Sequence, residues 1–478
     1  MSRRACLCGR TATRCGHRTR PSPMSLDTRR SRGLFPGLIE SPASALPSLI
    51  RHLIGLIVVG LLIGLACWPL NLTDTVQDQL YRLLPTRSDR PWTLVGVLIA
   101  LMPIVVMPVL LLLQRGPWKD GAGSGIPSTM NGLEDPSKLP KAMAAAGTVQ
   151  RGVLWGIATV AMFPLGREGP VVQFGAAVAR AAHKRLAGWL PSLTERQMVA
   201  IGGGAGLAGG FNTPLLGAVF ALEELTADYS IITLWPALVI SVAAAGFSHW
   251  GGEPIFGLGV INVMVPEEEQ LLIALPVGLV GGLVGGFFNK GLVWATGRLM
   301  EVVKRRPIRV GVLLGGGLAL LALLSWGTSS SDGEALIRQL MDEGLPTIDP
   351  AGGQIAAGLT SLWITVVRVI APMIALAPGV PGGLIDPSLT FGAVVGYTVC
   401  AILGVSQHLG IALGMAAGLA GATQLPLVSI VFAWRLTGDQ QLFAGVVLAA
   451  VIAAYVGRLV ARQPVYHALG ALQRAPRR

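Results

Sequence analysis

Charged residues are scarce in this sequence. Asp, Glu, Lys and Arg make up only 13% of the 478 residues, whereas 52% of the residues are hydrophobic and the mean hydropathy is +0.62. A soluble chain ordinarily carries about twice that share of charged residues. The short segments of alternating hydrophobicity that form a transmembrane β-barrel are also missing. We therefore expect an all-α polytopic membrane protein, whose helices cross a lipid bilayer many times.

Motifs for nucleotide cofactors are missing as well. The chain has no Gly-Lys-Ser/Thr phosphate loop, which argues against ATP-driven transport. Residues 204–209 match the Gly-x-Gly-x-x-Gly dinucleotide fingerprint. No strand pattern precedes them, however, so we interpret these glycines as a contact between helices. We expect no cofactor.

The five cysteines and six histidines are too scattered to form a disulfide framework or a metal site. Cys6, Cys8, Cys15 and His17 lie close together in the sequence, but their spacing fits no ordinary zinc site. The two other cysteines lie in apolar runs and are expected to be packing residues. We expect no bound metal.

Long apolar runs recur along the chain. Crossing the hydrocarbon core of a bilayer takes about 20 residues of apolar helix. Runs near that length occupy residues 53–70, 92–113, 271–287, 310–324, 355–376 and 442–460. Many of the 63 glycines fall within apolar stretches, where small side chains let membrane helices pack closely. The sequence thus predicts a domain of tightly packed membrane helices at residues 49–470.

The net charge of +12 is concentrated near the start of the chain. Residues 1–32 contain nine arginines and one acidic residue, Asp27. Residues 1–48 are expected to be a basic, disordered tail in which Met24 is a candidate true start; a transit peptide is the alternative. Because basic residues favour the cytoplasmic ends of membrane helices, both termini are expected in the cytoplasm, with the protein in the cell inner membrane. No nucleic-acid partner is expected.

The sequence contains a long-range internal repeat. At a constant offset, Gly166, Pro170, Phe174, Gly175, Ala176 and Val178 recur as Gly383, Pro387, Phe391, Gly392, Ala393 and Val395. At nearly the same offset, Ala208, Gly209, Pro214, Leu215, Val219, Phe220 and Ala221 recur as Ala420, Gly421, Pro426, Leu427, Val431, Phe432 and Ala433. We expect two related halves, about residues 50–265 and 266–460, with a substrate site between broken helices near the membrane midplane.

Glycine and proline interrupt the apolar pattern at residues 123–127 (GSGIP), 166–170 (GREGP) and 382–387 (GGLIDP). Proline is tolerated in the first turn of a helix, and glycine lets the preceding backbone turn sharply. Each segment therefore predicts a helix N-terminus. Such an end presents free N–H groups and a partial positive charge, so the three together predict a site for a small anion.

These segments resemble the signature motifs of the chloride channel and transporter (CLC) family. Residues 211–215 (FNTPL) and the following Glu223-Glu224 add to the resemblance, which covers roughly residues 50–470. In the second half the family has Gly-x-Phe-x-Pro, whereas this chain has Ile385 in place of the phenylalanine. The resemblance implies a homodimer in which each subunit consists of two inverted structural repeats of tilted and broken helices.

The resemblance also implies roles for single residues. The hydroxyl groups of Ser124 and Tyr466 would coordinate the anion, and serine at this position favours chloride. Glu168 would be the external gate, which also binds a proton, and Glu224 resembles the internal proton-transfer glutamate of exchangers. The other candidates for anion binding lie in or beside the Gly/Pro segments: Gly123, Gly125, Arg167, Gly169, Leu384 and Ile385.

Several of these residues have a structural alternative. Ser124 also suits the cap of a helix that follows a tight turn, and Arg167 also suits a structural ion pair. Glu223 and Glu224 are alternatively a solvated helix end. Asp386 has no acidic counterpart in the family motif; it is a candidate helix cap, a charge that repels the anion, or an added proton site.

The favoured function is chloride/proton antiport by a membrane-embedded homodimer. A passive chloride channel of the same fold, gated by voltage or pH, is the first alternative, because Ile385 changes the second-half motif. A multi-pass membrane enzyme that uses Glu168 or the Glu223/Glu224 pair as acid or base is disfavoured, since no nucleophile or cofactor motif accompanies them. Only a short tail, residues 471–478, follows the last segment, so the family's regulatory CBS domains are not expected.

Overall fold

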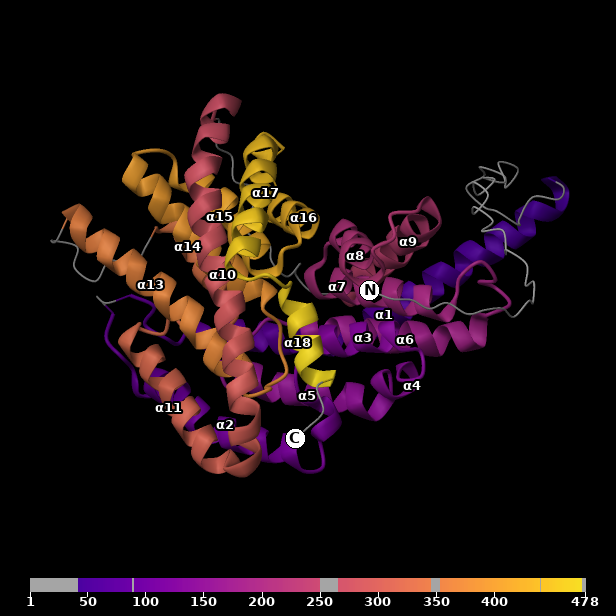
Figure 1. Cartoon of the computed structure of the whole chain (residues 1–478), viewed down its shortest axis with the longest axis horizontal. Helices are drawn as coiled ribbons and strands as arrows, with labels where there is room; N and C mark the ends of the chain where they lie inside the picture. The colour runs from indigo at the N-terminus through magenta and orange to yellow at the C-terminus, as the bar shows by residue number, and fades with distance from the viewer. Residues whose placement is uncertain (1–41, 88–89, 250–264, 345–352, 439, 475–478) are drawn as a thin grey trace, which may run out of the picture.

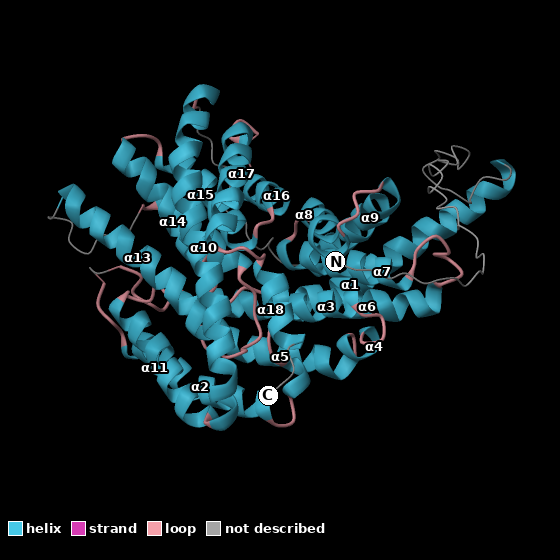
Figure 2. Cartoon of the chain, in the orientation of Figure 1, coloured by secondary structure: helices cyan, strands magenta, loops and turns pink. Residues whose placement is uncertain are grey.

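The computed structural model describes residues 42–87, 90–249, 265–344, 353–438 and 440–474. Nearly all of these residues lie in helices (Figures 1 and 2). The expected all-α fold is therefore confirmed.

The first half comprises α1 (Pro42–Tyr81), α2 (Leu94–Arg115), the short 3-10 helix η1 (Lys119–Gly121), α3 (Gly125–Glu134), α4 (Leu139–Ala142), α5 (Ala145–Val160), α6 (Glu168–Leu186), α7 (Glu195–Phe211), α8 (Pro214–Phe220), the π-helical turn η2 (Ala221–Thr226) and α9 (Ile231–Ser248). The second half comprises α10 (Glu267–Arg305), α11 (Pro307–Leu324), α12 (Glu334–Asp342), α13 (Gly353–Leu376), α14 (Ile385–Leu403), α15 (Gln407–Thr423), α16 (Pro426–Thr437) and α17 (Phe443–Val460). A final helix, α18 (Val465–Arg474), follows.

The ends of the helical region differ slightly from the expected boundaries. Helix α1 begins at Pro42, within the stretch expected to be a tail, and α18 continues to Arg474. The candidate features of the N-terminal tail lie outside the described residues: Cys6, Cys8, Cys15, His17 and Met24.

Eight helices of the described residues are long and apolar enough to cross a membrane. Large apolar side chains on their outer faces are highly exposed, including Leu94, Leu313 and Leu459 at 77%, 74% and 84%. Exposed apolar surface of this extent suits a lipid environment and not water. The chain is an integral membrane protein.

The two halves repeat the same packing pattern. Helix α6 packs against α7 as α14 packs against α15, and α1 packs against α9 as α10 packs against α17. Glycines allow the closest of these contacts: Gly175 lies against the backbone of α7, and its equivalent Gly392 lies against that of α15. The glycines of residues 204–209 lie inside α7, as expected for a helix contact. The predicted internal repeat is confirmed.

A backbone bridge joins equivalent residues of the two halves. The N–H of Gly166 donates to the carbonyl of Gly383 at 3.1 Å, and the N–H of Gly383 donates to the carbonyl of Gly166 at 2.8 Å. An antiparallel pair that exchanges both hydrogen bonds has local two-fold symmetry. The halves are therefore inverted repeats about an axis through this bridge, and the N-termini of α6 and α14 converge beside it.

Candidate anion and proton site

All three Gly/Pro segments lie at helix N-termini, as predicted. Helix α3 begins at Gly125, α6 at Glu168 and α14 at Ile385. Trp155 fixes the bridge between the last two, because its Nε1–H donates to the carbonyl of Gly166 at 3.1 Å. The free N–H groups of α6 and α14 are thus held close together in a buried place.

The carboxylate of Glu168 lies on the N-terminus of α14. Glu168 is fully buried, and its Oε1 accepts hydrogen bonds from the N–H groups of Ile385 and of Asp386, the latter at 3.3 Å. Its Oε2 has no hydrogen-bond partner among the described residues. The side chain therefore occupies the position that a small anion would take at the end of this helix.

The turn before α3 is shaped by Gly123 and a buried arginine. Gly123 has φ +74°, which favours glycine, and its N–H donates to the carbonyl of Gly379 at 2.7 Å. Arg151 Nε donates to the carbonyl of Gly123 at 2.9 Å, and Nη2 donates to that of Ala122 at 3.0 Å. Arg151 was not among the predicted site residues, although an arginine within an apolar helix is a signal that could have indicated it.

Ser124 precedes α3 but does not cap it through its side chain. No cap hydrogen bond from Ser124 occurs in the described structure, and its buried Oγ has no partner there. Ser124 thus occupies the cap position of α3, as the helix-cap alternative has it, but without a side-chain capping hydrogen bond. A Cβ atom placed on Gly169 would lie 2.9 Å from Ser124 Oγ and 2.6 Å from the carbonyl oxygen of Gly382. Gly169 thus lets the three helix ends approach.

Tyr466 reaches the same region from α18. This helix packs on α3, where Asn131 Nδ2 donates to the carbonyl of Gly470 at 3.3 Å (Figure 1). The Tyr466 side chain is buried, and its hydroxyl, like that of Ser124, lacks a hydrogen-bond partner in the described part of the chain. Two buried hydroxyl groups without a protein acceptor are suited to donating to a bound anion.

Arg167 belongs to a buried ion-pair cluster, which corrects its assignment to anion binding. Its Nη2 lies 2.5 Å from Asp74, 3.4 Å from Asp332 and 3.7 Å from Glu334. These three carboxylates are close enough together to resemble a cation site, but the guanidinium group already lies among them. A guanidinium surrounded by carboxylates compensates their charge and does not attract an anion. The structural alternative is therefore the correct one.

Glu223 and Glu224 follow α8 as expected, but Glu224 is not a solvated helix end. Its side chain is only 3% exposed, and its Oε1 lies 3.6 Å from Nδ1 of His467. Glu223 is half-buried and accepts hydrogen bonds from the N–H groups of Leu427 and Val428 at 3.1 and 2.7 Å. The first-half carboxylate Glu223 thus lies on the N-terminus of α16.

The turn after Glu224 is fixed by Asp228, which lies outside the candidate membrane spans. Its carboxylate accepts hydrogen bonds from the hydroxyls of Thr233 at 2.8 Å and Ser230 at 2.9 Å. These hydrogen bonds lower the pKa of Asp228. The chain is thereby directed from η2 into α9.

Asp386 does not cap α14, so that interpretation is wrong. The residue at the cap position is Leu384, and Asp386 lies in the first turn. It is fully buried, and neither of its carboxyl oxygens has a hydrogen-bond partner in the described residues.

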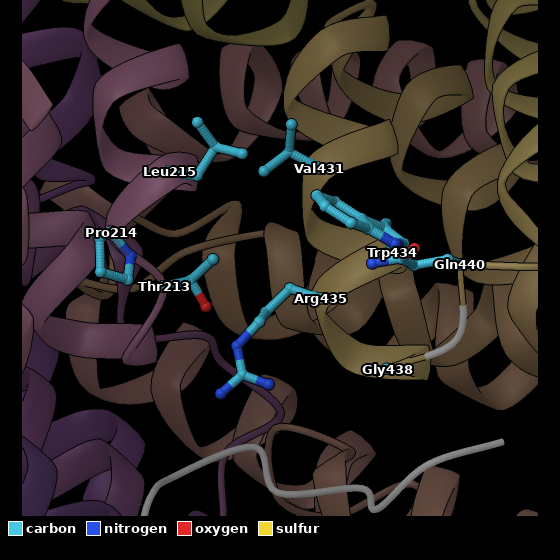
Figure 3. A pocket seen from close by; sticks show the side chains of 8 residues that line it. All are labelled: Thr213, Pro214, Leu215, Val431, Trp434, Arg435, Gly438 and Gln440. Carbon is cyan, nitrogen blue, oxygen red and sulfur yellow. The ribbon is translucent and has the colours of Figure 1, made fainter.

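A cavity of about 260 Å³ lies apart from these residues, between α8 and α16. In Figure 3, Arg435 extends from α16 toward Thr213 at the start of α8. The cavity is lined by Thr213, Pro214, Leu215, Val431, Trp434, Arg435, Gly438 and Gln440. None of the predicted anion-binding or proton-transfer residues lines it.

Comparisons with known proteins agree with this geometry. The family described as voltage gated chloride channel matches residues 105–458. A relative named H(+)/Cl(-) exchange transporter ClcA, from Yersinia pseudotuberculosis, is 27% identical over 420 residues, which are 83% of this chain and 82% of the relative.

Solved structures share the fold at low sequence identity. A slow cyanobacterial Cl-/H+ antiporter aligns with TM-score 0.71 at 21% identity, covering 89% of this chain and 99% of the other. A CLC-type fluoride/proton antiporter aligns with TM-score 0.67 at 23% identity, covering 88% and 98%. A eukaryotic CLC transporter aligns with TM-score 0.71 at 18% identity, covering 90% and 75%.

Proposed function

This chain belongs to the voltage gated chloride channel family, and from that premise we propose that it exchanges chloride for protons across a membrane. Membership of a transport family means that it is not an enzyme. Antiport is supported by the names of its relatives, one a chloride/proton exchange transporter and another a chloride/proton antiporter.

The observation that carries the proposal is the position of the Glu168 carboxylate on the N–H groups of Ile385 and Asp386. An ionised carboxylate competes with chloride for these donors, because both are anions that favour a helix N-terminus. When Glu168 takes up a proton it loses its charge and leaves the site, and chloride enters. Anion passage and proton binding therefore alternate at one place.

The chloride ion would be held by donors that carry no full charge. The hydroxyls of Ser124 and Tyr466 are buried and available, and the backbone N–H of Ile385 adds a third donor. Gly125 and Gly169 let the helix ends approach, because a Cβ atom on either would lie against the backbone of a neighbouring helix end. Gly123 forms the turn before Ser124, and the backbone N–H of Leu384 is a further candidate donor to the ion. Since Arg167 is occupied by carboxylates, the ion is not trapped by a free guanidinium, and it can leave quickly.

Glu224 is the inner proton-transfer group in this proposal. It is buried, and the Tyr466 hydroxyl interacts electrostatically with both Glu224 and Glu168, which supports a route between the two carboxyl groups that passes near Tyr466. A buried carboxyl group away from the anion site gives the proton a route that chloride does not share. A passive channel of the same fold is the alternative. It is favoured only by Ile385, which replaces the family's phenylalanine.

We propose the setting of the protein on the same basis. Two copies form a homodimer with a separate pathway in each subunit, embedded in the cell inner membrane. Both termini face the cytoplasm. The end of α1 then lies toward the external side together with Glu168, whose neighbour Arg167 pairs with Asp74 of α1. Glu224, beside His467 of α18, lies toward the internal side.

The test is proton movement in liposomes that contain the purified protein. A chloride gradient is the only driving force, and a potassium ionophore clamps the membrane voltage. Antiport predicts uphill proton movement that is lost in Glu224→Gln. Chloride flux without proton movement would show a channel instead. No flux with any halide would contradict the proposal as a whole.

A further inference from the structure

A second buried carboxyl group, Asp386, lies beside Glu168 and has no role in the mechanism above. Asp386 is fully buried in the first turn of α14. Its backbone N–H points at Glu168 Oε1 at 3.3 Å, and both of its carboxyl oxygens lack hydrogen-bond donors in the described residues. In the repeat its equivalent is Gly169, so only one half carries a carboxyl group at this position.

The groups around Asp386 supply it with no cation of its own. The charged groups that interact electrostatically with Asp386 are Glu168, Arg167, Asp332 and Asp74. Asp386 also interacts electrostatically with the Tyr466 hydroxyl. Arg167 is the one cation in that set, and it already contacts Asp74, Asp332 and Glu334. An ionised Asp386 would therefore be a buried charge with neither partner nor donors, which is very costly.

On the basis of the proposed antiport, we propose that Asp386 is a second proton-carrying group, which relays protons between the buried acidic cluster (Asp74, Asp332 and Glu334) and Glu168. Two neighbouring carboxyl groups that cannot both be charged share a proton. Asp386 holds the proton while ionised Glu168 lies on α14. On transfer, the O–H bond of Asp386 breaks and one forms on Glu168. A protonated carboxyl group of the cluster then gives its proton to Asp386 before chloride arrives: its O–H bond breaks, one forms on Asp386, and Arg167 compensates the new carboxylate.

Chloride binding to the purified full-length protein tests this relay. In Glu168→Gln the gate no longer titrates, so a remaining pH dependence must come from another group. We expect chloride affinity in this variant to fall as pH rises, by up to about tenfold per pH unit, because ionised Asp386 repels the anion. In Glu168→Gln/Asp386→Asn the dependence should disappear. Isothermal titration calorimetry over a pH series measures both.

The control is Glu168→Gln/Thr390→Val. Thr390 lies one turn further along α14, where its hydroxyl donates to the carbonyl of Asp386 at 2.8 Å. The Thr390→Val substitution should leave the pH dependence of chloride affinity unchanged. If Asp386→Asn prevents folding, Asp386→Ala offers a second neutral replacement. A pH-independent chloride affinity in Glu168→Gln alone would overturn the relay, whereas absence of chloride binding in wild type would overturn the proposed function instead.

An independent observation concerns the opposite, inner end of the proton route. Nδ1 of His467 lies 3.6 Å from Oε1 of Glu224; the histidine side chain is 48% exposed and the glutamate side chain 3% exposed. Neighbouring acids do not replace this contact, because Glu223 is hydrogen-bonded to the N-terminus of α16 and Glu134 of α3 pairs with Arg474. The imidazole therefore lies between the exposed surface of the chain and the buried carboxyl group.

We infer that His467 delivers protons from water to Glu224. Imidazole gains and loses a proton near neutral pH, which suits it to transfer between solvent and a buried acid. Nε2 of the neutral ring first takes a proton from water, which forms the imidazolium. The N–H bond at Nδ1 then breaks and an O–H bond forms on ionised Glu224, and the neutral ring returns to its Nδ1–H tautomer by proton exchange with water.

His467→Ala in the liposome assay tests the delivery step. We expect proton movement to slow several-fold while chloride flux continues, and free imidazole in the internal buffer to restore part of the proton rate. His408→Ala is the control, because that imidazole is also exposed but contacts the carbonyl of Met341. An unchanged proton rate in His467→Ala would overturn the inference. A wild-type protein without any coupled proton movement would overturn the antiport proposal instead.

Discussion

The two halves of the molecule have the same backbone arrangement but different chemistry at equivalent positions. Glu168 in the first half corresponds to Ile385 in the second, and Glu223 corresponds to Arg435. In both contacts across the halves, the carboxylate comes from the first half and the N–H donors from the second. The repeat thus provides a symmetric frame, and single side chains give it a direction.

The ends of α8 and α16 show the same contrast. The N-terminus of α16 receives Glu223, whereas the equivalent end of α8 faces Arg435 and borders a cavity (Figure 3). A carboxylate is favoured at a helix N-terminus and a guanidinium is not. The asymmetry in charge therefore leaves one of two equivalent places filled and the other open.

The largest effect is expected from Glu168→Gln, which removes the charge of the proposed gate and with it the main difference between the two halves. The amide cannot take up or release a proton, so chloride-driven proton movement should be abolished, while chloride flux persists and no longer depends on Glu168 protonation. Flux measurements in liposomes check this. Glu301→Gln, at an exposed ion pair with Arg305, should behave as wild type. Coupled proton movement in Glu168→Gln would show that another group is the gate.

The next largest effect is expected from Arg167→Met, which makes the first half like the second, where the equivalent residue is Leu384. The change leaves Asp74 and Asp332 without their cation. Removing one partner of a buried ion pair typically costs about 3 to 5 kcal/mol. Thermal unfolding in detergent should show this as a large loss of stability. Arg305→Met, at an exposed pair with Glu301, is the control and should change stability by less than about 1 kcal/mol.

Gly169→Ala adds to the first half a Cβ atom that its equivalent, Asp386, already has. The new atom would lie 2.6 Å from the carbonyl oxygen of Gly382 and 2.9 Å from Ser124 Oγ. Overpacking of this kind costs about 1 to 3 kcal/mol, so we expect chloride binding about 5- to 150-fold weaker. Calorimetric titration with chloride measures it. Gly188→Ala, on a glycine with open space around it, should bind as wild type.

The smallest effect is expected from Glu223→Gln. It removes the negative charge from the N-terminus of α16 but keeps the side-chain volume, which should cost about 0.3 to 1 kcal/mol. Unfolding in detergent should detect the loss. Arg435→Gln, at the equivalent position, removes a cation from the last turn of α16, where it is favourable, and from the N-terminus of α8, where it is not. The two effects oppose each other, so the net loss of stability should be smaller than in Glu223→Gln. Equal losses in the two variants would contradict the asymmetry.

The positions of the helix ends were predictable from the sequence because they depend on local chemistry. Glycine and proline at residues 123–127, 166–170 and 382–387 specify a turn followed by a helix, whatever surrounds them. The internal repeat was visible for a similar reason, since proline and phenylalanine recur in register within apolar stretches. The span of the membrane domain followed from hydropathy.

The partners of charged groups could not be predicted, because they come from distant parts of the chain. Arg167 lies next to Asp74 and Asp332, and Glu223 lies next to Val428, so no local pattern indicates either contact. Asp386 appeared suited to capping α14. The structure shows Glu168 on the N–H groups that a cap would use, so a residue from the other half displaced the local candidate.

The bridge between Gly166 and Gly383 bears on how such a chain could have arisen. It uses backbone atoms alone, so two identical half-length ancestors could already have formed it as a dimer. In that dimer every residue beside the axis would have been present twice. A single Glu168 with Ile385 as its equivalent, and a single Asp386 with Gly169 as its equivalent, require one chain in which the two halves can differ.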